Sequence, residues 1–167
     1  MFAFAKKNGD DAVLTKLREE YDKKIQEITS IQNANNSVLD ISAINNKNKT
    51  NYYHNLIKET DINTLKTKDE VHEYLWLYYS YMSSLLDETA KRASRFKNKN
   101  INSYYRYFTK FSTKLYKQTR EVITKNSNKS IDDSINNVIR FCSNKKSEVY
   151  NKINNFNNII SNNHGVN

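Results

Sequence analysis

The sequence predicts an all-α fold: an antiparallel bundle of three long helices, with an N-terminal helix that packs as a fourth member or extends as an arm. The 167 residues contain no proline and only two glycines, Gly9 and Gly165, which lie near the ends. All-β folds need many tight turns built on these two residue types, so their scarcity favours long helices. Apolar residues also recur at intervals of three and four, as on one face of a helix. Capping signals then indicate where the helices begin.

The chain length suits one domain with a moderate core. We expect four parts along it. Residues 1–9 form a flexible aromatic tag, residues 10–66 an N-terminal helix with an irregular connection, residues 67–161 the core of the bundle, and residues 162–167 a disordered tail.

The N-terminal helix is expected at residues 10–32. Asp10 is a plausible N-cap, and Glu19 with Lys23 makes a favourable i,i+4 pair on the solvent face. The apolar stripe of this helix consists of Leu14, Leu17, Tyr21, Ile28 and Ile31.

The connection at residues 33–66 gives weaker signals. After an Asn-rich break, residues 38–44 fit either a helical turn or a strand. Residues 45–51, "NNKNKTN", indicate a loop, and residues 52–65 allow a short helix. We therefore expect this part of the chain to be largely irregular.

The next helix begins at a capping box formed by Thr67 and Glu70 and extends to about Phe96. Its heptad-like seam consists of Val71, Leu75, Tyr78, Met82, Leu85, Thr89, Ala93 and Phe96. The centre of the helix reads "YLWLYYSY" (residues 74–81), with five aromatic rings in eight positions. The apolar run to Leu86 is about 13 residues, too short for the roughly 20 that span a bilayer.

This aromatic segment is apolar on more than one face, which indicates burial by several neighbouring helices. A strand is the local alternative, but the capping box and the continuing seam favour a helix. The other interpretation is that part of the surface meets another protein chain, because Tyr and Trp are typical interface anchors. The candidate interface residues in this segment are Tyr74, Trp76, Leu77 and Tyr81.

Two further helices follow short breaks. Ser103 is a candidate N-cap for the first, whose seam consists of Tyr104, Phe108, Phe111, Leu115 and Val122. Ser130 with Asp133 resembles a second capping box. The seam that follows consists of Ile131, Ile135, Val138, Cys142, Val149, Ile153, Phe156 and Ile160. Because Cys142 lies on this seam, we expect a small buried hydrophobe rather than a reactive thiol.

Residues suited to catalysis or metal binding are sparse. The histidines His54, His72 and His164 lie far apart. Asp69 and His72 make one helical metal-binding pair, whereas a di-iron bundle needs two such pairs and further carboxylates. A Gly-rich phosphate loop is excluded by composition, and no Ser or Cys lies in a recognisable nucleophile motif. We therefore expect a non-enzymatic protein without metal or cofactor.

Positive charge is concentrated in one stretch of the chain. The whole sequence carries +9, and residues 91–129 contain twelve Lys or Arg residues and one acid, Glu121. That stretch alone carries +11, which leaves −2 for the remainder. An A/T-rich genome, as in some bacteria, their phages and plasmids, would enrich Asn, Lys, Ile and Tyr everywhere. It gives no reason to remove Asp and Glu from one stretch.

Many of these bases fall on one face of the helix that starts near Ser103. At about 100° per residue, four of them lie roughly opposite the apolar seam: Arg106, Lys110, Lys117 and Arg120. The candidate nucleic-acid-binding residues are Arg92, Arg95, Lys97, Lys99, Arg106, Lys110, Lys114, Lys117 and Arg120. Tyr105 and Tyr116 flank this face, in positions to stack on bases or lie against phosphates.

Three interpretations of the basic face remain open. It is a solvated or salt-bridged surface, a surface for a polyanion (nucleic acid being favoured over a membrane), or a surface for an acidic protein. The acids that would neutralise it from neighbouring helices are Asp69, Glu70, Glu73, Asp87 and Glu88.

We expect a binding or assembly protein whose basic face contacts nucleic acid. The alternative is a structural subunit of a virion-like or other large assembly, held by aromatic helix contacts. In the tag, Phe2 and Phe4 are candidates for docking on a neighbour; packing on the chain's own bundle, or disorder, is the simpler interpretation. One cysteine and the lack of a signal-peptide pattern favour an intracellular protein that is not secreted.

Overall fold

The computed structural model describes residues 11–35 and 41–163, and every regular element within these ranges is a helix. The elements are α2 (Asp11–Asn35), α3 (Ile41–Glu59), the 3-10 turn η1 (Ile62–Thr64), α4 (Lys68–Ser94), α5 (Lys99–Asn102), α6 (Tyr104–Asn126) and α7 (Ile131–Asn163). The predicted all-α helical bundle is therefore confirmed. Phe2, Phe4 and the candidate cap Asp10 lie outside the described residues. α7 extends two residues into the predicted tail.

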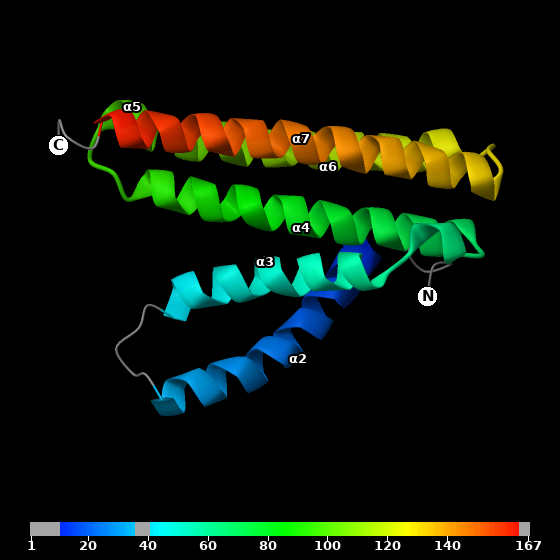
Figure 1. The fold of residues 1–167 in the computed structure, drawn as a ribbon, viewed down its shortest axis with the longest axis horizontal. Coiled ribbons are helices and arrows are strands. Elements are labelled where there is room, and N and C mark those ends of the chain that lie inside the picture. Colours follow the sequence, from blue (N-terminus) through cyan, green and yellow to red (C-terminus); the bar gives the residue numbers. More distant parts are fainter. Residues whose placement is uncertain (1–10, 36–40, 164–167) are drawn as a thin grey trace.

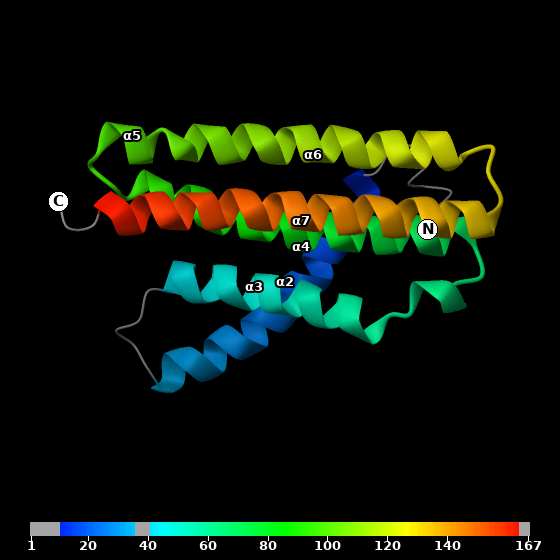
Figure 2. The same ribbon diagram turned by 45° about the horizontal axis from the view of Figure 1, so that its top comes forward.

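α4 is the central helix of the bundle (Figure 1). α6 and α7 run alongside it on one side, and α3 follows it on the other (Figures 1 and 2). α2 contacts both α3 and α4 through its first turns, where Val13, Leu17 and Tyr21 are buried. Its later turns diverge from α4 (Figure 1). The N-terminal helix therefore packs at its start and extends as an arm at its end.

The capping box at the start of α4 is confirmed. The Thr67 hydroxyl accepts a hydrogen bond from the Glu70 amide at 3.1 Å, and the Glu70 carboxylate accepts one from the Thr67 amide at 3.1 Å. The predicted seam faces the core, with Val71, Leu75 and Met82 at 0% exposure. The helix therefore begins at the residue that the sequence indicates and buries the face that its spacing indicates.

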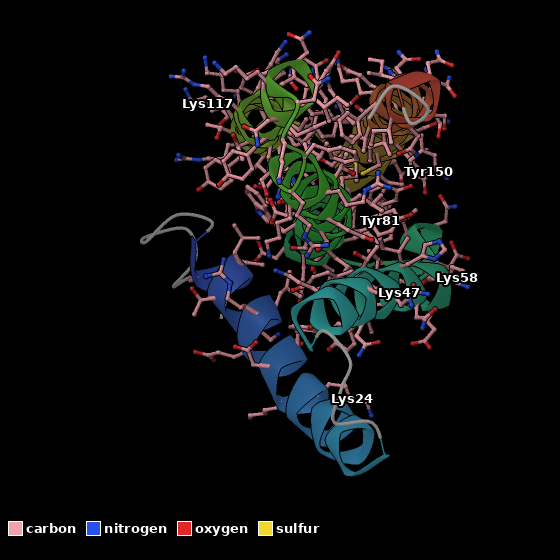
Figure 3. All side chains as sticks on the ribbon, turned by 90° about the vertical axis from the view of Figure 1, so that its left-hand side faces the viewer. Lys24, Lys47, Lys58, Tyr81, Lys117 and Tyr150 are labelled. Atoms are coloured by element: carbon pink, nitrogen blue, oxygen red, sulfur yellow. The ribbon has the colours of Figure 1, made fainter. Side chains whose placement is uncertain are left out.

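The aromatic segment at residues 74–81 belongs to the core of the chain itself. Trp76 is 1% exposed, Leu77 7% and Tyr81 5%, while Tyr74 is partly buried against the same core. The hydroxyl of Tyr81 forms a hydrogen bond with that of Tyr150 on α7, and Figure 3 shows the two side chains facing each other. Neighbouring helices of the same chain therefore cover these residues on α4, and their role as anchors for another chain stays a prediction.

The prediction of a loop at residues 45–51 is wrong, because these residues belong to the helix α3. Asn is a weak helix former, and four of the seven residues there are Asn. Thr50 and Tyr53 lie one turn apart and are both buried, and the Tyr53 ring lies 6.0 Å from that of Tyr21 on α2. Tertiary burial thus outweighs the local preference for a loop.

The candidate cap Ser103 does not cap α6. It adopts helical dihedral angles (φ −60°, ψ −21°), and its hydroxyl donates to the Asn100 carbonyl at 2.7 Å. The side-chain cap in this region belongs to the preceding short helix α5: the Asn98 side chain accepts a hydrogen bond from the Asn100 amide at 2.8 Å. The Ser130 hydroxyl does accept from the Asp133 amide at 3.1 Å, as the second capping signal predicts.

A buried amide connects the end of α6 to α4 and α7. Asn126 is 0% exposed; its Nδ2 lies 3.2 Å from His72 Nε2, and its Oδ1 accepts from Asn137 Nδ2 at 3.0 Å. The Lys68 ammonium donates to the Asn126 carbonyl at 3.0 Å and to two more carbonyls of the following turn. These contacts satisfy carbonyls that the end of a helix leaves unpaired.

Asn126→Ala should destabilise the fold by about 1–3 kcal/mol, because the change removes the hydrogen bonds that the buried Asn126 side chain makes with His72 and Asn137. The measurement is the free energy of unfolding from urea denaturation followed by circular dichroism. Asn128→Ala, in the exposed turn nearby, is the control and should stay within about 0.5 kcal/mol of the parent. Equal stability of the two variants would show that the buried amide contributes little.

Candidate nucleic-acid interface

α6 turns its apolar side to the bundle and its basic side to solvent. Phe108 and Leu115 are 0% exposed, whereas Arg106, Lys110 and Lys117 are exposed. Figure 3 shows Lys117 on the side of α6 that faces away from α4. Packing the seam of an amphipathic helix against a central helix fixes the direction of its polar face. The packing of the apolar seam of α6 on α4 therefore also directs the basic side chains of α6 toward solvent.

Four exposed bases follow one another along α6 and are called here the basic row: Arg106, Lys110, Lys114 and Lys117. At 1.5 Å per residue, the row spans about 17 Å of helix. Within the described part of the chain, none of the four side chains makes an ion pair. Their positive charge is therefore not neutralised by that part of the protein.

Two of the acids that could have neutralised this face, Glu70 and Glu73, are engaged elsewhere. Glu73 pairs with Lys16 on α2 at 3.3 Å, and Glu70 closes the capping box. The opposite charge that acts most strongly on Asp87 is Lys49 on α3. Among the described residues, no ion pair joins an acid of α4 to the basic row. The salt-bridged interpretation of the face therefore lacks the contacts that it requires.

Among the remaining candidate bases, Arg120 is exposed and borders the same surface groove as Lys117, whereas Arg92 is engaged within the bundle. Arg92 is half-buried: its Nη2 donates to Asn157 Oδ1 at 2.7 Å and its guanidinium lies 5.8 Å from the Phe156 ring centre. It therefore contributes to the contact between α4 and α7, and its role in binding nucleic acid stays a prediction. Arg120 packs over Tyr116 at 5.9 Å. The exposed bases at the turn before α6, at one end of the bundle, are Arg95, Lys97 and Lys99.

Two exposed tyrosines lie on either flank of the basic row. Tyr105 is 47% exposed and Tyr107 is 42% exposed. The second predicted ring, Tyr116, packs instead against Trp76 at 5.4 Å and Tyr79 at 5.8 Å, so it is part of the core packing. Tyr107 was not predicted as a flanking residue, although its position on the α7 side of the helix could have been derived from the helical period.

Tyr107 borders a groove between α5, α6 and α7 with a volume of about 610 Å³. On its α7 side, the Lys152 ammonium donates to the Tyr107 hydroxyl at 2.8 Å and lies 5.3 Å from the ring centre. The remaining lining residues are Asn100, Ser103, Tyr104, Asn155, Phe156 and Ile159. Aromatic rings, amide groups and one cation therefore meet directly beside the basic row.

Two side chains considered for nucleophilic chemistry or metal binding, Cys142 and His72, make contacts within the fold. Cys142 is 3% exposed, and burial raises the pKa of its thiol far above the ordinary value. His72 contacts the buried Asn126. Across the described ranges, no three His, Cys, Asp or Glu side chains come together in a way that could hold a metal ion. No helix there has the length and apolar character to cross a membrane.

The sequence matches no family model, and no curated protein or solved structure is significantly similar to it.

Cys142 should react with a thiol-specific disulfide reagent at least about 100-fold more slowly in the native protein than in the urea-unfolded chain. Each unit of raised pKa lowers the reactive thiolate fraction about tenfold, and burial also blocks access. The measurement is the labelling rate at neutral pH, with the unfolded chain as the control. Rapid stoichiometric labelling of the native protein would show that α7 does not bury this thiol.

Proposed function

We propose that this chain is a non-enzymatic nucleic-acid-binding protein in which the basic row of α6 contacts the phosphate backbone. The observation that carries the proposal is the row itself: Arg106, Lys110, Lys114 and Lys117 are exposed along one helix face and make no ion pair with the described part of the chain. A solvated helix face usually mixes both signs of charge. Residues 91–129 contain a single acid.

Phosphate contacts of this kind bind without direct recognition of sequence. Lys and Arg side chains replace counterions on the nucleic acid, so affinity falls steeply as salt rises. Within the described residues, the row is accompanied by no second basic helix that would insert into a groove. We therefore expect affinity to depend on chain charge far more than on base sequence.

The exposed rings beside the row favour single strands over a duplex. Bases of a single strand can stack on aromatic side chains, which is worth about 1–3 kcal/mol per base, whereas the bases of a duplex are already stacked. Tyr105 and Tyr107 lie on the two flanks of the row, and the groove beside Tyr107 offers room for an unstacked base.

The alternative, a structural subunit held by aromatic contacts of α4, has less support. Trp76, Leu77 and Tyr81, the side chains on which it relies, contact the chain's own helices. An acidic protein partner for the basic row is distinguished from nucleic acid by the experiments below, because it would not reproduce the preference for single strands.

Replacing Arg106, Lys110, Lys114 and Lys117 together by Gln should strongly reduce affinity for a single-stranded oligonucleotide at low salt. Each lost phosphate contact lowers the slope of log affinity against log salt by about 0.7 for single strands. The measurement is fluorescence anisotropy over a salt series. Because Gln is a good helix former and the seam is unchanged, the melting temperature should hold.

The matched control replaces Lys23, Lys47, Lys58 and Lys66 by Gln. All four are exposed and lie on α2, on α3 or in the segment before α4, and Figure 3 shows Lys47 and Lys58 on the opposite side of α4 from Lys117. This variant loses the same charge but should keep most of the affinity. If both variants lose affinity equally, binding follows net charge and the basic row has no special role. Full affinity of the α6 variant contradicts the proposal.

Tyr105→Ser with Tyr107→Ser should weaken binding to a single strand by about tenfold or more and leave binding to a duplex of equal length nearly unchanged. The measurement is the ratio of the two dissociation constants. Ile139→Ser is the control, because Ile139 is an exposed apolar side chain on α7. An unchanged ratio in the double variant would exclude base stacking as the source of the single-strand preference.

A further inference from the structure

A partly open polar cavity of about 210 Å³ lies on the side of α4 that faces α2 and α3. This volume is several times the roughly 30 Å³ that one water occupies in the liquid. Side chains from α2, α3, α4 and α6 line the cavity: Leu14, Arg18, Lys49, Tyr53, Tyr79, Ser80, Ser83, Ser84, Asp87 and Tyr116. We call it the Asp87 cavity.

The α4 wall of the Asp87 cavity presents hydrogen-bond acceptors. The Ser80 hydroxyl donates to the Trp76 carbonyl at 2.9 Å, and the Ser84 hydroxyl donates to the Ser80 carbonyl at 2.7 Å. Because each hydroxyl has only one hydrogen, each of these oxygens can take part in a further hydrogen bond only as an acceptor. The Asp87 carboxylate, one turn beyond Ser83, adds a charged acceptor to the same wall.

The opposite wall presents cationic donors, namely Lys49 on α3 and Arg18 on α2. Lys49 and Asp87 are both partly buried, and burial lowers the pKa of Lys49 and raises the pKa of Asp87, while the opposite charge of each residue counteracts the shift of the other. Within the described part of the chain, neither side chain makes a hydrogen bond or an ion pair. Partly buried charges are usually paired or hydrogen-bonded because desolvation is costly. Here the two charges face one cavity without direct contact.

We propose that the Asp87 cavity binds a small zwitterionic α-amino acid. The ammonium group of such a ligand donates to the Asp87 carboxylate and the serine oxygens, and its carboxylate accepts from Lys49 and Arg18. A neutral polyol would satisfy hydrogen bonds but neutralise neither wall. A simple anion would neutralise Lys49 and leave the Asp87 carboxylate facing another negative charge.

An adjoining cavity of about 320 Å³ indicates which amino acids fit. It shares Tyr79, Asp87 and Tyr116 with the Asp87 cavity and continues toward α6. Its further lining consists of Thr109, Ser112 and Thr113, and Ser112 Oγ lies 3.2 Å from Ser83 Oγ at the junction. A ligand side chain in this space meets hydroxyl groups, so L-serine should bind more tightly than L-alanine.

The proposal is independent of nucleic-acid binding. The basic row belongs to the outer face of α6, and none of its four residues lines either cavity. A chain that fails to bind nucleic acid can still bind an amino acid, and the reverse also holds, so each failure can be recognised separately.

The test is isothermal titration calorimetry of the full chain with L-serine, L-alanine and glycine, supported by the shift in melting temperature that binding produces. Two analogues each lack one charge: N-acetyl-L-alanine has no ammonium group and L-alaninamide has no carboxylate. We expect saturable binding of the free amino acids, with L-serine tightest. Each analogue should bind more weakly than L-alanine by at least about tenfold.

Asp87→Asn and Lys49→Gln should each weaken L-serine binding by at least about tenfold. Glu88→Gln is the matched control, because Glu88 follows Asp87 on α4 but lines neither cavity; it should bind L-serine like the parent. If a variant does not fold, the series of analogues measured on the parent protein still tests the proposal. The proposal is overturned if no free amino acid binds at millimolar concentration, or if glycerol or acetate binds as tightly as L-serine.

Discussion

Burial of α4 around most of its circumference is the constraint on which the rest of the structure depends. Trp76 packs against Tyr116 of α6, and Tyr81 contacts both His54 of α3 and Tyr150 of α7. A helix that is apolar on several faces is stable only when several neighbours cover it. Each covering helix must turn its own apolar stripe toward α4, and its remaining face is left to solvent. The outward direction of the basic row is therefore a consequence of how the core is built.

Helices whose start and apolar face are marked by neighbouring residues can be predicted from the sequence. A helix that is stabilised mainly by contacts with distant segments cannot. The capping box of Thr67 and Glu70 and the 3–4 spacing after it are properties of a few neighbouring residues, so α4 could be recognised directly. The helix α3 could not, because its Asn-rich first half has weak helix propensity. Contacts of Tyr53 with α2 and α4 stabilise it, and such contacts between distant segments leave no trace in a local pattern.

The same distinction between local and tertiary signals applies to the surroundings of the candidate site residues. The helical period alone places Lys110 and Lys117 opposite the seam, and they are exposed as expected. The period does not show which polar side chains bend back onto another helix. Arg92 therefore seemed equivalent to the row, although it contacts α7. Tyr107 acquires its setting from Lys152 on α7, a residue 45 positions away along the chain, so its groove could not be predicted from α6.

The basic row and the Asp87 cavity lie on different sides of α6, and their charged groups differ in exposure to solvent. Ser112 lies about 100° or more around the helix from Lys110 and Lys117. A polyanion on the outer face meets solvent-exposed charges, which salt screens strongly, whereas a ligand beside Asp87 meets charges partly removed from water, which salt screens much less. The same rise in ionic strength therefore weakens the first contact and largely spares the second. The two share no side chain, and the packing of α6 on α4 is the structural connection between them.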